Sequence, residues 1–206
     1  MTERFAAALV WLDFLGVAVF AATGALAAAR AKQTLVTFAF FAAVTGVGGG
    51  TVRDLLIDVP VFWVHAPAYL ATCLAVSLLV WFSSPDRWPV GLLLWLDAVG
   101  LAAFAVLGAA KAWSAGLSAL VCIVMGVLTA TFGGVVRDVL AGEPSILLRR
   151  EIYVTAAALA AAMFMALVTL GTPPLWAGVA GAGAGFALRA GALAKGWALP
   201  NFRSRA

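Results

Sequence analysis

Two short segments carry most of the side chains that could do chemistry, and both join glycines to a charged pair. Residues 45–54 read TGVGGGTVRD, and residues 129–138 read TATFGGVVRD. Consecutive glycines weaken a helix by about 1 kcal/mol each. Arginine and aspartate within an apolar stretch must find partners, since a charge at the centre of a bilayer costs at least ~2.5 kcal/mol. Each segment therefore combines a weak point in the backbone with an ion pair, an arrangement suited to handling a charged solute.

The two Arg-Asp pairs are expected to face the interior of a helix bundle. We predict crossed pairing between the segments, in which Arg53 binds Asp138 and Arg137 binds Asp54. Two interpretations remain open and do not exclude each other. The pairs are either structural clamps near the interface or elements of a pore.

A second set of polar side chains lies in the same apolar stretches. Asp13 and Asp97 each lie near the start of a predicted helix. There a carboxylate either binds the free amides of the helix N-terminus or concentrates cations at a pore mouth. The hydroxyls of Thr45 and Thr129 either face a hydrated ion or bond to their own helix backbone, which is the commoner case.

The composition excludes several classes of protein. The 206 residues are 65% hydrophobic and only 11% charged, with a mean hydropathy of +1.07, which is typical of a chain whose solvent is mostly lipid. The net charge of +4 does not indicate nucleic acid binding, because the basic residues are spread over several loops. Motifs of known enzyme families are lacking, and a single histidine leaves little for acid–base catalysis. No enzyme activity, cofactor or metal is predicted.

Seven apolar spans are predicted, at residues 8–29, 35–58, 66–82, 90–111, 115–140, 150–170 and 174–194. Most approach the ~20 residues that cross a ~30 Å hydrocarbon core. One side of the membrane would carry most of the basic residues: Arg30, Lys32, Arg87, Arg149, Arg150, Lys195, Arg203 and Arg205. The other side would carry Arg4 and Lys111. Because basic loops stay in the cytoplasm, the N-terminus is predicted outside and the C-terminus inside, in the inner (plasma) membrane.

An internal repeat organises these spans. A shift of 84 residues places Asp13 on Asp97, Gly49-Gly50 on Gly133-Gly134, Arg53-Asp54 on Arg137-Asp138, Pro60 on Pro144 and Tyr69 on Tyr153. Three spans in each copy, an odd number, invert the second copy in the membrane, and a working site is then expected between the copies. We predict an all-α integral membrane fold with seven transmembrane helices, in which an inverted 3+3 repeat is followed by one C-terminal helix.

The predicted single membrane domain, residues 1–206, contains repeat A at about 8–82, repeat B at about 90–170 and the extra helix at about 174–194. Within each repeat, the middle helix is expected to kink or open at its glycines. Freed backbone groups are tolerated in lipid only against protein or a water-filled cavity. In the extra helix, Gly181 and Gly185 form a small-xxx-small pair that packs either within one protomer or between protomers.

The repeated motif, GGGTVRD in one copy and FGGVVRD in the other, resembles prokaryotic members of the trimeric intracellular cation (TRIC) channel family. The resemblance extends over nearly the whole chain. It implies a homotrimer in which each protomer has its own pore for monovalent cations such as potassium. The phosphoinositide ligand of the animal relatives is not transferred, because Val52-Arg53-Asp54 stands where they have Lys-Glu-Val. Phe132 stands where the first copy has Gly48, and it would narrow the path.

The candidate pore and gating residues are Thr45, Gly48, Gly49, Gly50, Arg53, Asp54, Thr129, Phe132, Gly133, Gly134, Arg137 and Asp138, with Asp13 and Asp97 at the pore mouth or as caps. Monovalent cations and membrane lipid are the predicted partners. The alternative function is a secondary transporter of glycine or a similar small zwitterion, held by the ends of broken helices. A purely structural membrane protein is disfavoured, because duplicated intramembrane charges are costly.

Overall fold

The computed structural model describes residues 2–83, 88–89, 91–148 and 151–200, and within these ranges the chain is almost entirely helical. The helices are α1 (Thr2–Arg30), α2 (Leu35–Leu56), α3 (Phe62–His65), α4 (Ala68–Trp81), α5 (Leu92–Ser114), α6 (Ala119–Leu140), the 3₁₀ turn η2 (Ile146–Leu148), α7 (Val154–Thr169) and α8 (Pro174–Lys195). Five of the basic residues used to predict the orientation lie outside the described ranges: Arg87, Arg149, Arg150, Arg203 and Arg205.

The helices correspond to the seven predicted spans, but not all have the same length. Within the described ranges, five helices are long and apolar enough to cross a membrane: Val10–Arg30, Leu35–Leu56, Leu92–Ser114, Ala119–Leu140 and Pro174–Lys195. The third helix of each repeat is shorter, with 14 residues in α4 and 16 in α7. Each is preceded by a short turn, and Phe62 and Ile146, the first residues of these turns, match under the repeat shift. The copies therefore share their irregular connections as well as their helices.

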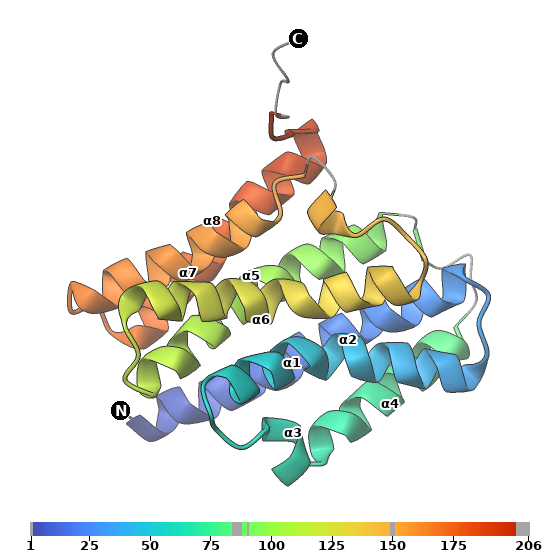
Figure 1. Ribbon diagram of the computed structural model, residues 1–206, viewed down its shortest axis with the longest axis horizontal. Coiled ribbons are helices and arrows are strands. Elements are labelled where there is room, and N and C mark those ends of the chain that lie inside the picture. Colours follow the sequence, from blue (N-terminus) through green and yellow to red (C-terminus); the bar gives the residue numbers. More distant parts are fainter. Residues whose placement is uncertain (1, 84–87, 90, 149–150, 201–206) are drawn as a thin grey trace.

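The middle helices of the two repeats cross at the centre of the bundle. Figure 1 shows α2 and α6 side by side and running in opposite directions, as an inverted repeat requires. At the crossing the backbone at Gly49 meets the carbonyl oxygen of Thr129, and the backbone at Gly133 meets the carbonyl oxygen of Thr45. A Cβ at either glycine would overlap that oxygen. These two glycines are therefore needed for the close approach of two backbones.

Each middle helix was predicted to kink or open at its glycines, and the opening is contradicted. Both α2 and α6 are continuous α-helices through their glycine segments. At Gly49 and Gly133 the loss of helix propensity is offset by close packing against the backbone of the opposing helix. Gly49 and Gly133 therefore serve the packing of the two helices.

The first helices of the two repeats are matched in the same way. A Cβ at Gly16 would overlap the ring of Phe104, and a Cβ at Gly100 would overlap the ring of Phe20. These two rings stack with their centroids 5.1 Å apart. The four helices α1, α2, α5 and α6 thus form a core of two equivalent halves.

The extra helix α8 packs against α7 of its own chain. A Cβ at Gly181 would lie 2.7 Å from the carbonyl oxygen of Ala160, and a Cβ at Gly185 would lie 2.6 Å from the Ala160 Cβ. The small-xxx-small pair is thus used within the protomer.

Alanine substitutions in the glycine segment test the close crossing. Gly49→Ala and Gly133→Ala should each lower the stability of the detergent-solubilised protein by about 1–3 kcal/mol, because a backbone carbonyl must move to admit the methyl group. Gly48→Ala is the matched control, since its Cβ would meet no described heavy atom within 4 Å. It should leave the stability unchanged or raise it by up to about 1 kcal/mol. Thermal unfolding would measure all three, and equal losses would contradict the crossing.

Candidate functional site

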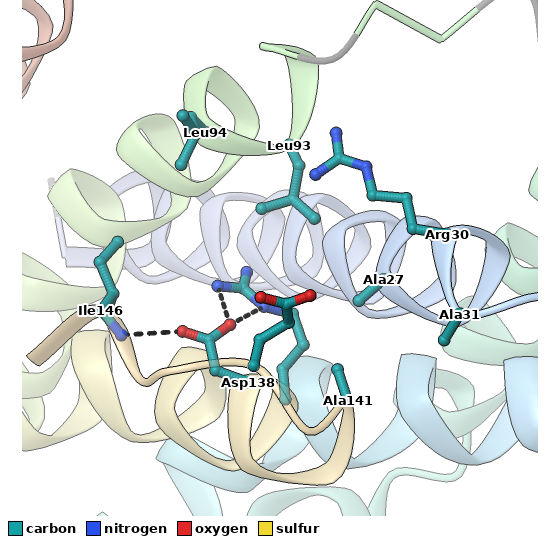
Figure 2. Close-up of a pocket in the computed structure, with 10 residues that line it drawn as sticks. Ala27, Arg30, Ala31, Leu93, Leu94, Asp138, Ala141 and Ile146 are labelled. Atoms are coloured by element: carbon teal, nitrogen blue, oxygen red, sulfur yellow. Dashed lines mark hydrogen bonds and ion pairs between the residues drawn. The ribbon is translucent and has the colours of Figure 1, made fainter. Parts of the chain in front are cut away.

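Two cavities enter the core between the repeats. Cavity A has a volume of about 340 Å³ and is lined by Asp13, Arg53, Phe62, Tyr69 and Lys111 together with mainly apolar side chains. Cavity B has a volume of about 420 Å³ and is lined by Arg30, Leu93, Arg137, Asp138 and Glu143, among others. Figure 2 shows cavity B, with Asp138 extending from α6 and Leu93 and Leu94 contributed by α5. Each cavity therefore contains the arginine of one repeated Arg-Asp motif.

The cavities lie at opposite ends of the bundle. Helix α1 contributes Asp13 to cavity A and Ala27 to cavity B. At 1.5 Å per residue these positions are about 21 Å apart along the helix. The close crossing of α2 and α6 at Gly49 and Gly133 lies between them, since each crossing glycine precedes the arginine of its own helix by one turn.

The ion pair of the second repeat is buried beneath cavity B. Arg137 Nε donates to Asp138 Oδ1 at 2.9 Å, and Arg137 Nη1 donates to Asp97 Oδ1 at 2.7 Å. The backbone N–H of Ile146 donates to Asp138 Oδ2 at 3.0 Å. One guanidinium thus binds two carboxylates, and one of these, Asp138, also holds the chain where it turns back after α6.

The ion pair of the first repeat has nearly the same geometry. Arg53 Nε donates to Asp54 Oδ1 at 2.8 Å, and the backbone N–H of Phe62 donates to Asp54 Oδ2 at 3.0 Å. The third partner differs, because Lys111 Nζ lies 2.8 Å from Asp54 Oδ1. Here one carboxylate is shared by two cations, the reverse of the arrangement at Arg137.

The predicted crossed pairing is wrong. Arg53 binds Asp54 of its own repeat, and Arg137 binds Asp138 of its own repeat. The physical reason is the antiparallel crossing of α2 and α6. Because each arginine follows its crossing glycine by four residues, the two motifs move about 6 Å away from the crossing in opposite directions. The two motifs therefore lie at opposite ends of the seam, which is the contact region between α1, α2, α5 and α6, and they cannot meet.

The capping alternative for the two aspartates is also wrong. Helices α1 and α5 begin at Thr2 and Leu92, so Asp13 and Asp97 lie beyond the first turn, where free amides end. Asp97 is fully buried and binds Arg137, whereas Asp13 is half-buried in cavity A and accepts a hydrogen bond of 3.1 Å from Tyr69 Oη. The repeat places both carboxylates beside an Arg-Asp motif.

Thr45 of α2 and Thr129 of α6 lie at the crossing between the cavities. Both are buried, and both contribute the carbonyl oxygen that the opposing glycine meets. The Thr129 hydroxyl donates to Met125 of its own helix at 2.6 Å, as expected of a threonine in a helix. The Thr45 hydroxyl has no hydrogen-bond partner within the described part of the chain. It is the polar group left available at the centre of the seam.

The remaining glycine-segment candidates lie in different surroundings. A Cβ at Gly50 would meet the Phe62 ring, and one at Gly134 would meet the Tyr153 hydroxyl, so both positions support the ion-pair regions. Gly48 and Phe132 are only half-buried, and neither is among the described residues that line the two cavities. The position of Phe132 does not favour a role in narrowing the path.

Sequence reasoning missed Lys111 as a partner of the motif. A lysine at the end of an apolar span usually extends to the interface, yet Lys111 turns inward to Asp54. The repeat offered a signal for an unusual role of this lysine. The 84-residue shift places Lys111 on Ala27, so the positive charge is present in the second copy and absent from the equivalent position of the first. Arg30 lines the opposite cavity one turn beyond Ala27.

The comparisons with known proteins agree with this duplicated arrangement. The family model described as "Glycine transporter" matches residues 10–85 and again residues 94–169.

The chain belongs to this family.

The two matches begin 84 residues apart, which is the predicted repeat shift. The chain is 45% identical over 149 residues to the UPF0126 inner membrane protein YadS of Escherichia coli (strain K12), covering 71% of this chain and 72% of that protein. It is 38% identical over 199 residues to a UPF0126 membrane protein of Vibrio cholerae, covering 94% of this chain and 82% of the relative.

Solved structures of TRIC proteins share the fold. The TRIC trimeric intracellular cation channel orthologue from Rhodobacter sphaeroides superposes with a TM-score of 0.86 at 47% identity, covering 92% of this chain and 99% of that one. A second structure, described as a TRIC cation channel, has a TM-score of 0.85 at 30% identity and covers 95% and 97% of the two chains. The predicted resemblance and the predicted inverted-repeat membrane fold are confirmed. The relatives of known structure are channels rather than enzymes, as predicted.

The unequal sharing of charges predicts unequal effects of removing each arginine. Arg137→Gln removes the guanidinium that binds both Asp97 and Asp138, and it should lower the free energy of unfolding by about 3–5 kcal/mol. Arg53→Gln should cost less, because Asp54 keeps Lys111. Thermal unfolding of the two variants in the same detergent compares them. Asp97→Asn combined with Arg137→Gln should recover part of the loss, and equal losses at the two arginines would refute this description.

Proposed function

We propose that the chain is a monovalent cation channel, permeable to potassium, with one ion path in each protomer of a homotrimer. The path runs from cavity A to cavity B along the seam between α1, α2, α5 and α6. The observation that carries the proposal is the pair of cavities at opposite ends of the seam, each ending on an equivalent ion pair. The likeness to proteins named as TRIC cation channels supports it. In this proposal residues 1–206 form one membrane domain.

The ion-pair residues give neither cavity a net positive charge, because in cavity A the carboxylates of Asp13 and Asp54 balance Arg53 and Lys111. In cavity B, Arg137 pairs with two carboxylates, Asp97 and Asp138, which leaves this cluster with an excess of negative charge, and Glu143 adds a further carboxylate at the lining. In cavity A, Asp13 forms no ion pair within the described part of the chain and accepts a hydrogen bond from Tyr69 instead. Carboxylates at the mouth of a narrow path raise the local concentration of cations.

The crossing of α2 and α6 is the narrowest part of the proposed path. The helices touch there, so conduction requires them to separate slightly or to rotate. The Thr45 hydroxyl and the carbonyl oxygens of Thr45 and Thr129 are the polar groups available to a cation that has lost part of its hydration shell. The buried arginines lie one turn away on either side, where a movement of the guanidinium would alter the barrier, which makes them gating candidates.

A transporter of glycine or another small zwitterion is the second candidate, and the description of the matching family model favours it. Cavity A offers both charges that a zwitterion needs, with Lys111 and Arg53 for a carboxylate and Asp13 for an ammonium group. Purified protein in proteoliposomes distinguishes the two. Saturable exchange of labelled glycine without unitary currents would establish the transporter, and unitary currents that reverse near the potassium equilibrium potential would establish the channel.

The salt dependence of conductance tests the role of Asp13 in the proposed channel. Asp13→Asn should reduce the unitary potassium conductance strongly at about 0.01 M salt and little at about 1 M, because screening shortens from roughly 30 Å to roughly 3 Å. Asp58→Asn is the control, since Asp58 is exposed at the same end of the bundle and does not line the cavity. Planar-bilayer recordings measure both variants. A loss that is the same at both salt concentrations would exclude electrostatic attraction by Asp13.

The orientation is a separate proposal, with cavity A outside and cavity B in the cytoplasm. The bias of basic residues in the sequence toward the loops on the side of Arg30, which lines cavity B, supports it. The description of the relative YadS as an inner membrane protein supports the membrane in which the protein is placed. On intact cells a membrane-impermeant thiol reagent should label Ser114→Cys, which lines cavity A, and should spare Ala31→Cys, which lines cavity B. The native Cys73 and Cys122 are buried and set the background. The opposite labelling pattern would show that cavity B faces the outside and cavity A faces the cytoplasm.

A further inference from the structure

Helix α8, which has no counterpart in the repeat, brings a buried arginine toward cavity B. Ala177, Gly181, Gly185 and Arg189 follow each other at intervals of four residues, so they share one face of the helix. All four are buried, and the two glycines bring this face into close contact with α7. Arg189 lies at the end of this stripe and is only 1% exposed. A buried guanidinium is costly unless it is well paired, so its partners define its role.

The partners of Arg189 lie in the segment that leads into α7. Its Nη2 forms an ion pair with Glu151 Oε2 at 2.5 Å, and its Nη1 donates to the carbonyl oxygen of Ile152 at 3.4 Å. Its Cζ lies 5.3 Å from the centroid of the Tyr153 ring. At this distance the guanidinium is attracted to the face of the ring. Arg189 therefore fixes both the start of α7 and the tyrosine at that point.

The hydroxyl of Tyr153 lies beside the buried ion pair of cavity B. A Cβ built at Gly134 would lie 2.8 Å from Tyr153 Oη, 3.4 Å from Asp97 Oδ1 and 3.6 Å from Arg137 Nη2. The hydroxyl, the carboxylate and the guanidinium therefore surround the same backbone position. A shift of the Tyr153 ring would move its hydroxyl against these two charges.

The first repeat holds its tyrosine differently. The ring of Tyr69 stacks on Phe14 with centroids 4.0 Å apart, and its hydroxyl donates to Asp13. The repeat shift places Phe14 on Ala98, so the second copy lacks this aromatic partner. Arg189 stands over the Tyr153 ring instead. An aromatic support from within the repeat has been replaced by a cation from outside it.

We propose that Arg189 is a positioning residue for cavity B. By holding the Tyr153 ring it places the Tyr153 hydroxyl against Asp97 and Arg137, and it thereby sets the conformation of this ion pair from a helix outside the repeat. The proposal concerns the geometry of the cavity and rests on the proposed function only for its consequence, which is that ion flow responds to movement of α8.

Thiol labelling in cavity B tests the proposal without requiring ion flow. Ala141→Cys places a reporter in the lining of cavity B, and Ser114→Cys places a matched reporter in cavity A. In the full-length protein, Arg189→Gln should speed the reaction of the first reporter with a positively charged thiosulfonate by roughly threefold or more, because the ion pair opens more easily. The second reporter should react at an unchanged rate. Thermal unfolding of the same samples verifies that each variant is folded.

A double-substitution cycle separates positioning from a general loss of structure. Tyr153→Phe removes the hydroxyl, and combined with Arg189→Gln it should change the labelling rate no more than the larger single change. Additive effects would overturn the proposal, as would an unchanged rate at Ala141→Cys or faster labelling at both reporters. If Arg189→Gln does not fold, Arg189→Lys keeps the charge near Glu151 without the planar group over the ring, and it should give a smaller increase.

The positioning role of Arg189 and the proposed channel can be disproved independently of each other. Faster labelling in a protein that carries no current would disprove the proposed channel and leave the positioning role intact. Unitary currents together with unchanged labelling would support the channel and disprove the positioning role.

Discussion

The close contact between the backbones of α2 and α6 is the constraint on which the rest of the structure depends. At the crossing, Gly49 faces the carbonyl oxygen of Thr129, and Gly133 faces that of Thr45, so neither helix can move nearer or slide without a backbone clash. This contact fixes the register of the two repeats. It also determines where each Arg-Asp motif lies, since the motif follows the crossing by one turn on a helix of fixed direction. The separation of the two cavities is a consequence of that geometry.

The two halves share a framework but differ in electrostatics. In both, an aspartate binds an arginine through one oxygen and a backbone N–H through the other. Around Asp54 a lysine has been added, whereas around Arg137 a second carboxylate is engaged. A solute crossing the seam therefore meets an excess of fixed positive charge in one ion-pair cluster and of negative charge in the other. The two ends of this pseudo-symmetric fold therefore differ in charge, and the two directions of passage are not equivalent.

The architecture followed from the sequence more readily than the contacts did. Hydropathy and the 84-residue shift were sufficient for the spans and the inversion, because lipid allows few alternatives to helices that satisfy their own backbones. The predicted crossed pairing of Arg53 was wrong because an inverted repeat places equivalent residues of α2 and α6 at opposite ends of the bundle. Helix opening at Gly49 failed because propensity cannot distinguish a weak helix from a tightly packed one. The contacts of Lys111 and Arg189 depend on tertiary packing that no local pattern encodes.

The hydrogen bonds from Phe62 and Ile146 to the two aspartates bear on how the copies have diverged. Each spans eight residues, although the intervening segments, LIDVPV after Leu55 and its counterpart after Val139, agree at little besides a leucine and a proline. Even the left-handed backbone position is retained, with Asp58 at φ 55° and Gly142 at φ 70°. The two connections have thus kept the same length and backbone shape since the duplication, while most of their residues have changed.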